Sequence, residues 1–363
     1  MKRIGFLIPV AFILILGTHC ASTGGIPQET AGFELALITD YGSVDDNSFI
    51  RGAWEGLVRY AREKNITHKY YRPSVQNDAA YLEAIDLAVR DGAKIIVAPG
   101  VLFETAVYTA QERYPDTRFI LVDSVPRNPE NGEYKTGNNT VSILYAEDQA
   151  GFLAGYAAVK DGYRRLGFMG GMAVPTVARF GYGFIQGIEY AAGELGLGPG
   201  AVTVNYHYTG DFAATPETQA LAASWYNAGT EVVFAAGGAV GNSVIAAAEQ
   251  TGKKVIGVDT DQSVESATVI TSAMKGLRVS VYACIFNSYA GRFQGGQTLV
   301  FSAVNSGVGL PMETSKFNSF SIADYDAVIQ KMVDGNIPRI EFLSSEGSMT
   351  PASELITVVT EFN

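Results

Sequence analysis

The stretch Leu37-Ile-Thr-Asp40-Tyr-Gly-Ser-Val-Asp45-Asp46-Asn47-Ser48-Phe49 decides the fold of this chain. An apolar strand ends on acidic and small polar residues, and a helix led by an aromatic residue follows directly. In an open α/β sheet, ligands bind at such corners, beyond the carboxyl ends of the strands. A Phe beside carboxylates can stack on a flat heterocycle while the acids accept hydrogen bonds from its N–H or O–H groups. The corner therefore predicts a small-molecule site.

Short apolar runs alternate with segments of helical periodicity from Phe33 onward. This alternation is typical of βαβ units and a parallel sheet. The pattern restarts after Glu147, so we predict an α/β protein with two doubly wound parallel-sheet lobes joined by a hinge, each able to bury a core. The last part of the chain is too short for a third domain and is expected to complete both lobes. The predicted lobes are 33–146 plus about 268–306, and 147–267 plus about 307–363.

The amino terminus has the features of an export signal. Lys2 and Arg3 precede an apolar run that is shorter than the roughly 20 residues that cross a bilayer, and Cys20 follows it. We predict a signal peptide over 1–19, lipidation of Cys20 at the cell membrane (periplasmic or extracellular face), and a tether over 20–32. An uncleaved anchor or a plain secretory signal is the alternative. Because Cys284 is the only other cysteine, no disulfide is expected.

Composition narrows the function. The formal net charge of −11 argues against nucleic-acid binding, which requires a basic surface. The sequence contains no GxSxG, HExxH, CxxC or GxxxxGK[ST] motif, so neither common catalytic chemistry nor nucleotide-phosphate binding is supported. We therefore expect a binding protein rather than an enzyme, without a cofactor or a metal.

Polar residues and glycines gather where predicted strands end. Asp40, Asp123 and Asp259 each follow an apolar run, and Gly238 lies in a glycine pair after another. Each Asp could instead cap a helix or form a turn. Carboxylates at these positions could accept hydrogen bonds from a ribose diol or a base, each contributing about 1.5–3 kcal/mol. Lobes facing each other by their strand ends would form one cleft.

Two phenylalanines are candidates for stacking on a ligand. Phe49 could also be the first core residue of its helix, whereas Phe212 follows Gly-Asp at a strand end. Phe180 competes with Phe212 for the second face of the ligand. A ring between two such residues would gain roughly 1–3 kcal/mol per partner. Lys275 is by default a solvated lysine, but in a cleft it would donate to a sugar hydroxyl.

One enzymatic alternative uses the same corner. The run from Thr39 to Asp46 resembles the calcium-binding amino-terminal corner of nucleoside hydrolases. That family has a further Asp two positions before the one that matches Asp40, where this chain has Ile38, and one fewer residue before the acid pair. Too few oxygen ligands then remain for a Ca²⁺ shell of about 6–8. A calcium-dependent nucleoside hydrolase stays the alternative hypothesis, beside a binding protein or sensor for another small ligand.

The chain resembles the basic membrane protein (Bmp) lipoproteins, and within them the purine nucleoside receptor type. The resemblance runs from about Glu34 to the end of the chain. It is carried by Thr39-Asp40-Tyr-Gly-Ser-Val-Asp45-Asp46-Asn47-Ser48-Phe49, Ala53-Trp54-Glu-Gly56, Ile120-Leu-Val-Asp123, Phe180-Gly-Tyr-Gly-Phe-Ile-Gln-Gly187, Ala235-Ala-Gly-Gly238, Ile256-Gly-Val-Asp259-Thr-Asp261-Gln262 and Thr271-Ser-Ala-Met-Lys275.

The resemblance implies a type I periplasmic-binding-protein fold and a role in delivering purine nucleosides (inosine, guanosine, adenosine) to the permease and ATPase of an ABC importer. It also implies that Phe49 and Phe212 form the two faces of a purine sandwich. The acids and Lys275 would contact base and ribose, and Gly238 would offer backbone. The expected ligand-binding set is Asp40, Ser48, Phe49, Asp123, Phe212, Gly238, Asp259 and Lys275.

Overall fold

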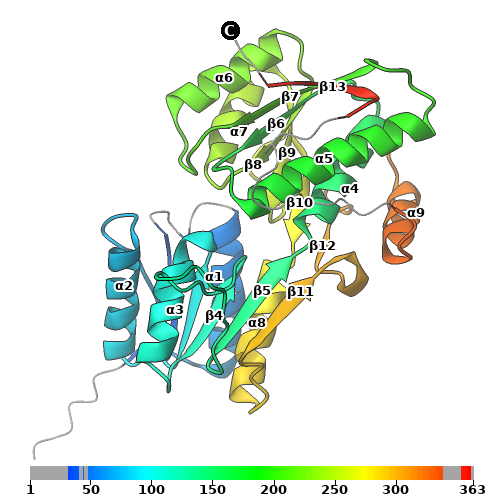
Figure 1. Ribbon diagram of the computed structural model, residues 1–363. Helices are drawn as coiled ribbons and strands as arrows, with labels where there is room; N and C mark the ends of the chain where they lie inside the picture. The colour runs from blue at the N-terminus through cyan, green and yellow to red at the C-terminus, as the bar shows by residue number, and fades with distance from the viewer. Residues whose placement is uncertain (1–31, 41–43, 45–47, 338–352, 361–363) are drawn as a thin grey trace, which may run out of the picture. The chain divides into compact units, whose positions relative to one another are not determined.

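A computed structural model describes residues 32–40, 44, 48–337 and 353–360 (Figure 1). The predicted signal peptide, Cys20 and nearly all of the predicted tether lie outside the described residues. The described residues belong to one compact unit that begins at Gly32. They form two sheets of predominantly parallel strands with helices on both faces, as the α/β prediction requires.

The described strands of the first sheet follow the order β11-β5-β4-β3-β1-β2, and all neighbours are parallel. Its strands are β1 (Leu35–Ile38), β2 (His68–Tyr71), β3 (Ile95–Pro99), β4 (Arg118–Val122), β5 (Thr140–Tyr145) and β11 (Gln297–Phe301). The helices around it are α1 (Phe49–Lys64), α2 (Asp78–Arg90), the 3₁₀ turn η1 (Val101–Phe103), α3 (Glu104–Arg113) and α8 (Leu277–Tyr289).

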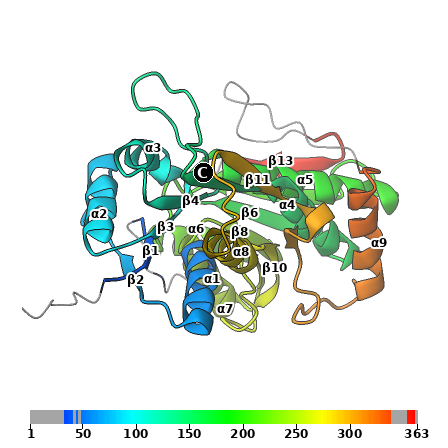
Figure 2. The ribbon, with the colours of Figure 1, turned by 90° about the horizontal axis from the view of Figure 1, so that it is seen from below.

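Alternation along β1 assigns these helices to opposite faces. Leu35 and Leu37 join a buried cluster with residues of α1 and α8, whereas Ala36 and Ile38 join one with residues of α2 and α3. Because successive side chains of a strand point to opposite faces, a continuous apolar run such as β1 fits a sheet that is covered on both sides. Figures 1 and 2 show α1 beside α8, with α2 and α3 across the sheet.

The described strands of the second sheet follow the order β12-β10-β9-β8-β6-β7-β13, and only β12 is antiparallel to its neighbour. Its strands are β6 (Arg165–Gly170), β7 (Val202–Tyr208), β8 (Val232–Ala236), β9 (Lys254–Asp259), β10 (Val269–Lys275), β12 (Val308–Gly309) and β13 (Ile356–Val359). The remaining helices are α4 (Glu147–Lys160), α5 (Pro175–Glu194), α6 (Pro216–Asn227), α7 (Val240–Thr251), the 3₁₀ turn η2 (Ala303–Asn305) and α9 (Ile322–Val333).

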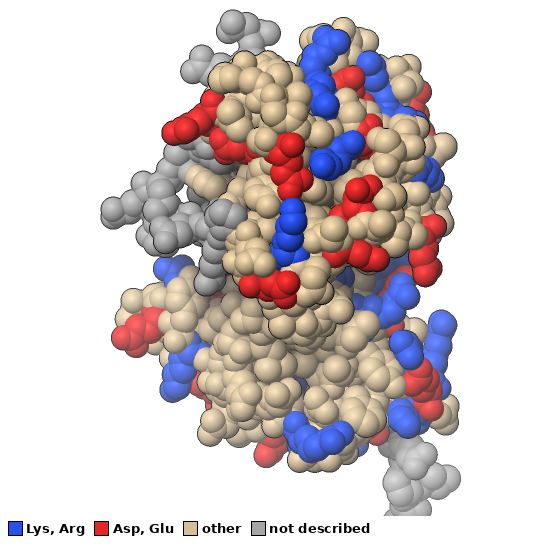
Figure 3. All heavy atoms as spheres, turned by 90° about the vertical axis from the view of Figure 1, so that its right-hand side faces the viewer, with Lys and Arg blue, Asp and Glu red and all other residues tan. Residues whose placement is uncertain are grey.

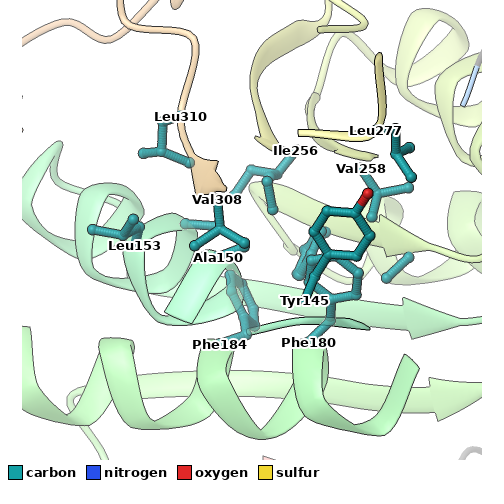
Figure 4. Packing of buried hydrophobic residues seen from close by; sticks show 14 of the residues in the cluster. Tyr145, Ala150, Leu153, Phe180, Phe184, Ile256, Val258, Leu277, Val308 and Leu310 are labelled. Atoms are coloured by element: carbon teal, nitrogen blue, oxygen red, sulfur yellow. The ribbon is translucent and has the colours of Figure 1, made fainter. Parts of the chain in front are cut away.

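Helices α4 and α5 lie unusually close together on one face of the second sheet. A Cβ added at Gly183 or Gly187 would lie 2.0 Å from a backbone oxygen of α4, so only glycine permits this approach. Figure 4 shows Phe180 and Phe184 of α5 projecting into the cluster that also holds Ala150 of α4. This contact fixes the start of α4 against α5, which matters for the site below.

The chain passes between the sheets after Tyr145, after Lys275 and after Phe301 in its described part. The second of these positions corrects the predicted lobe boundary near residue 268. Strand β10 pairs with β9 in the second sheet and leaves it only after Lys275. The error arose because β10 lies beyond the last βα unit of that lobe, where an apolar run does not reveal which sheet it joins.

Among the helices of the described part, none is both long and apolar enough to cross a membrane.

Candidate ligand-binding site

A cavity of about 550 Å³ lies at the carboxyl ends of strands from both sheets. From the first sheet, its wall includes Asp40, Pro99, Gly100 and Asp123; from the second, it includes Ala236, Gly237, Gly238, Asp259 and Lys275. Strand ends of parallel sheets are where side chains from several strands converge. The volume suits a drug-sized or nucleoside-sized molecule.

The structure brings most of the predicted site residues to this one cavity. Its wall includes Asp40, Phe49, Asp123, Phe212, Gly238, Asp259 and Lys275. Ser48 is the exception, because it is the fully buried N-cap residue of α1 and is not among the described lining residues. Phe49, the next residue, is only partly buried and reaches the cavity.

Asp123 directly follows β4 and Asp259 is the last residue of β9, and the two share an unusual backbone conformation. Their φ angles are +66° and +67°, in the left-handed region that non-glycine residues seldom adopt, although Asp tolerates it better than most. Both residues are buried, and the amide of Asp123 donates to the carbonyl of Ile143 at 2.7 Å. Each left-handed turn ends a strand and leaves its carboxylate on the cavity wall.

Lys275 lies at the centre of the site and is not a solvated surface lysine, since its side chain is 2% exposed. Its Nζ donates a short hydrogen bond to Asp123 Oδ2. It also lies 3.4 Å from Glu147 Oε1 and 3.6 Å from Asp259 Oδ1. Three carboxylates from different segments thus surround one ammonium.

Aromatic rings surround the same ammonium. The Lys275 Nζ lies 5.1 Å from the ring centroids of Phe49 and Phe180, and 5.5 Å from that of Tyr145. These distances are in the range of cation–π attraction. Phe49 is therefore next to the charged cluster rather than inside the core of its own lobe.

The ionisation of the cluster follows from burial and from its charges. Burial lowers the pKa of Lys275, but Asp123, Glu147 and Asp259 raise it more, so the pKa is above its ordinary value and the ammonium stays charged. Burial raises the pKa of Asp123, an effect that Lys275 opposes. Burial likewise raises the pKa of Glu147 to about 7, although Lys275 opposes this shift.

Phe212, the second aromatic candidate, packs against Gly171 and Gly238. A Cβ at Gly171 would lie 2.5 Å from Phe212 Cδ1, and Gly238 has a φ of +57° beside the carbonyl oxygen of Phe212. The amide of Ala239 donates to that oxygen at 3.0 Å. Phe180, the competitor for this role, also lines the cavity but is more deeply buried than Phe212. The cavity therefore presents one phenylalanine from α1 and two from the second lobe.

Charge in the cavity is one-sided. Its described wall carries Asp40, Asp123, Asp211 and Asp259 against Lys275 alone. The outer surface differs, because both signs are interspersed on much of the face in Figure 3. Helices α1, α5 and α7 begin at the cavity, and their amino-terminal dipoles offset part of the acidic charge. An acidic wall of this kind accepts hydrogen bonds from O–H and N–H donors.

Glu147 and Tyr145 belong to the cluster but are not among the predicted site residues. Tyr145 is the last residue of β5, and Glu147 lies two residues beyond it, much as Asp40 and Asp123 follow β1 and β4. The same signal could therefore have found Glu147.

The calcium alternative depends on residues that the structure describes only in part. Asp45 and Asp46 lie outside the described residues. Among the residues that are described, no group of three or more His, Cys, Asp or Glu side chains is arranged to hold a metal ion. The carboxylates that converge, Asp123, Glu147 and Asp259, meet at Lys275.

Comparison with known proteins supports this architecture. The model of the Bmp family, described as PnrA-like ABC transporter substrate-binding proteins, matches residues 33–341. The "ABC transporter nucleoside-binding protein BmpA" of Lactococcus lactis is 27% identical over 332 residues, which cover 85% of this chain and 90% of that protein. The "CD4+ T-cell-stimulating antigen" of Listeria innocua is 28% identical over 366 residues, which cover 93% and 98%.

A solved structure shows the same fold. An ABC transporter solute-binding protein from Aeropyrum pernix superimposes with a TM-score of 0.72 at 22% identity, covering 87% of this chain and 94% of that one. The predicted family and the predicted type I periplasmic-binding-protein fold are confirmed.

Proposed function

Because the chain belongs to the Bmp family of PnrA-like ABC transporter substrate-binding proteins, we propose that its cavity captures purine nucleosides such as inosine, guanosine and adenosine. The family's role is non-enzymatic and implies a permease and an ATPase as partners. Capture would proceed by closure of the two lobes around the ligand, a hinge motion common to binding proteins.

The observation that supports this proposal is that phenylalanine rings and aspartate carboxylates line the same cavity. Phe49 and Phe212 both line the cavity, and each is partly buried, so its ring has a face available to a ligand. A purine between two rings would gain roughly 1–3 kcal/mol per ring. The name of the Lactococcus lactis relative, a nucleoside-binding protein, supports the same ligand class.

The acids support a neutral, hydroxyl-rich ligand. Asp123 Oδ1 is buried and, among the described residues, has no hydrogen-bond partner, so it is available to a ribose hydroxyl or a base N–H. A ligand phosphate would instead meet four aspartates with one lysine as its only cationic neighbour on the described wall. We therefore expect nucleosides to bind and nucleotides to be rejected.

The site of action follows from the amino terminus. We propose that Cys20 is lipidated after cleavage of residues 1–19 and holds the protein at the cell membrane. Globomycin, which blocks lipoprotein signal cleavage, would then cause a larger precursor to accumulate. Processing that is unaffected by globomycin, or by Cys20→Ser, contradicts lipidation.

Thermal unfolding with and without ligand tests the proposed function. Purified protein is first unfolded and refolded to remove any molecule that it retains from the cell. Mass spectrometry identifies the molecule that is released. Inosine, guanosine or adenosine at ~100 times its dissociation constant should stabilise the protein by about 2.7 kcal/mol, whereas AMP and free ribose should have little effect. If none of the three nucleosides shifts the melting temperature, the nucleoside proposal is wrong.

Ring variants locate the binding. Phe49→Ala and Phe212→Ala should each weaken nucleoside binding at least ~10-fold, the loss expected for a stacking partner. Phe286→Ala is the matched control, because Phe286 is exposed on α8 and does not line the described cavity. Unchanged affinity in both cavity variants would exclude the sandwich.

The hydrolase alternative is tested by incubating inosine with the protein and Ca²⁺ for a prolonged time and separating the products by chromatography. Only a hydrolase would release ribose.

A further inference from the structure

Glu147 lies behind the cavity, where the chain crosses from the first sheet to the second. It is the first residue of α4, is fully buried, and is not among the described lining residues. The neighbouring crossing holds this segment in place, because the amide of Ala146 donates to the carbonyl of Phe301 at 2.9 Å. The amide of Ala303 donates to Gln149 Oε1 at 2.8 Å. The position of Glu147 is thus fixed by hydrogen bonds between two of the segments that cross from one sheet to the other.

The two carboxylate oxygens of Glu147 face two cations. Oε1 lies 3.4 Å from Lys275 Nζ, and Oε2 lies 3.4 Å from Arg179 Nη1 on α5. Among the described residues Oε1 is buried without a hydrogen-bond partner, so its interaction with Lys275 is purely ionic in this arrangement. Asp123 and Asp259 contact the same ammonium but line the cavity.

We propose that Glu147 is a positioning residue for ligand binding: its charged carboxylate, on the side of Lys275 away from the ligand, holds the ammonium in place on the cavity wall. The proposal rests on the proposed function and adds a residue that does not touch the ligand. Without this anchor, the ammonium, which already donates to Asp123 Oδ2, would move further toward the two cavity aspartates and compete with ligand hydroxyls for their remaining oxygens.

A structural role alone does not explain a carboxylate at this position. Burying an ion pair often gains little or nothing over well-packed apolar side chains, because both charges lose their hydration. The stretch of α4 that follows shows the apolar alternative, since Ala150, Leu153 and Ala154 are almost fully buried there. A buried acid at the hinge, aimed at a cavity lysine, therefore points to function.

The charge of Glu147 changes near neutral pH. The ionisable groups that interact with it are Lys275 from β10, Arg179 from α5, Asp123 after β4 and Tyr145 from β5, and Asp259 of β9 pairs with the same Lys275 ammonium. Burial raises its pKa to about 7. If binding needs the charged form, the ligand lowers this pKa in the complex. Affinity must then rise with pH until the group is charged in both states.

Calorimetric titration of the tightest-binding of the three nucleosides, from about pH 5.5 to about pH 8, tests this inference in the full exported chain. Wild-type affinity should rise roughly three- to tenfold over this range, since tenfold corresponds to a shift of one pKa unit. Glu147→Gln, which keeps the shape and removes the charge, should show a flat profile at the low-pH wild-type affinity. The matched control is Glu104→Gln, because Glu104 also has a pKa raised by burial but bonds to Ser124 instead of Lys275.

Each outcome decides between the hypotheses. A wild-type affinity that does not vary with pH, or a Glu147→Gln profile as steep as that of wild type, overturns the positioning role. If Glu147→Gln does not fold, Arg179→Met serves instead, because Arg179 lowers the pKa of Glu147 and its loss should shift the midpoint of the profile to higher pH. An unchanged midpoint then overturns the inference. Failure of wild type to bind any nucleoside contradicts the proposed function.

Discussion

Asp123 and Asp259 show how the two lobes build matching halves of one site. Each ends a buried strand with an almost identical left-handed φ, and each presents a carboxylate to the cavity. They differ in their relation to Lys275. Asp123 accepts a hydrogen bond from the ammonium, whereas Asp259 Oδ1 stays 3.6 Å away.

The local sequence of each strand determines the backbone conformation of its aspartate, whereas the chain crossings between the sheets determine which aspartate bonds to the ammonium. The backbone of each half follows from its own strand, as in Ile120-Leu-Val-Asp123 and Ile256-Gly-Val-Asp259. The ammonium comes from Lys275, at the point where the chain leaves the second sheet for the first, and it is bonded to the acid of the first lobe. The cluster is therefore a link across the hinge as well as part of the cavity wall.

Loss of the lysine should have the largest effect on this link. Lys275→Met would leave Asp123, Glu147 and Asp259 without their common cation, and removing one partner from a buried ion pair costs about 3–5 kcal/mol. Lys275 lowers the pKa values of Asp123 and Glu147, so both would rise without it and the folded state would bind more protons. The loss should therefore be greatest above neutral pH and smaller in mild acid, where the acids become protonated.

Chemical denaturation at two pH values measures this change. Lys331→Met is the matched control, because Lys331 pairs with Glu194 at the surface with 44% of its side chain exposed. It should lose less than about 1 kcal/mol. A Lys275→Met protein as stable as this control at high pH would contradict the view that the ammonium holds the cluster together.

The two aspartates can be compared directly by neutralising each one. Asn keeps the shape of Asp and its tolerance of a left-handed backbone, so Asp123→Asn and Asp259→Asn remove the charge and replace one acceptor oxygen with an NH2 group. We expect Asp123→Asn to cost about 1.5–3 kcal/mol, the contribution of a hydrogen bond to a charged group. Asp259→Asn, whose Oδ1 makes no hydrogen bond to the ammonium, should cost less. Equal losses in denaturant unfolding would show that distance to Lys275 does not distinguish the two lobes.

The sequence predicted the strand-end half of the site. An apolar run followed by Asp or by a glycine pair is a local pattern, and Asp40, Asp123, Gly238 and Asp259 all line the cavity. Ser48 lies in the same stretch of sequence but is a buried helix cap, because the first turn of α1 presents Phe49 and Ile50 to the cavity.

The sequence could not reveal the contacts made across the hinge. A lysine after an apolar strand is ordinarily solvated, and its burial here depends on three acids that lie 16 to 152 residues away in the chain. The strand that would have drawn attention to Glu147 was not predicted, and β10 was placed in the wrong lobe. The first error is a missed strand, which its local sequence could have revealed, whereas the second concerns which sheet a strand joins, and local periodicity does not encode that.

The aromatic walls of the two lobes also differ, and this difference gives the smallest expected effect. A Cβ at Gly100 would be 3.7 Å from Phe49, an ordinary contact, whereas one at Gly171 would be 2.5 Å from Phe212. Gly171→Ala should therefore displace the Phe212 ring and weaken nucleoside binding a few-fold, less than removing the ring, which contributes roughly 1–3 kcal/mol. Gly241→Ala is the control from the neighbouring glycine-rich segment, since a Cβ there meets no described atom within 4 Å. In a helix it should leave binding unchanged and slightly raise stability. Equal affinities of the two variants would show that the close contact with Gly171 is not needed to position the Phe212 ring. The two lobes would then not differ in how tightly they pack their rings.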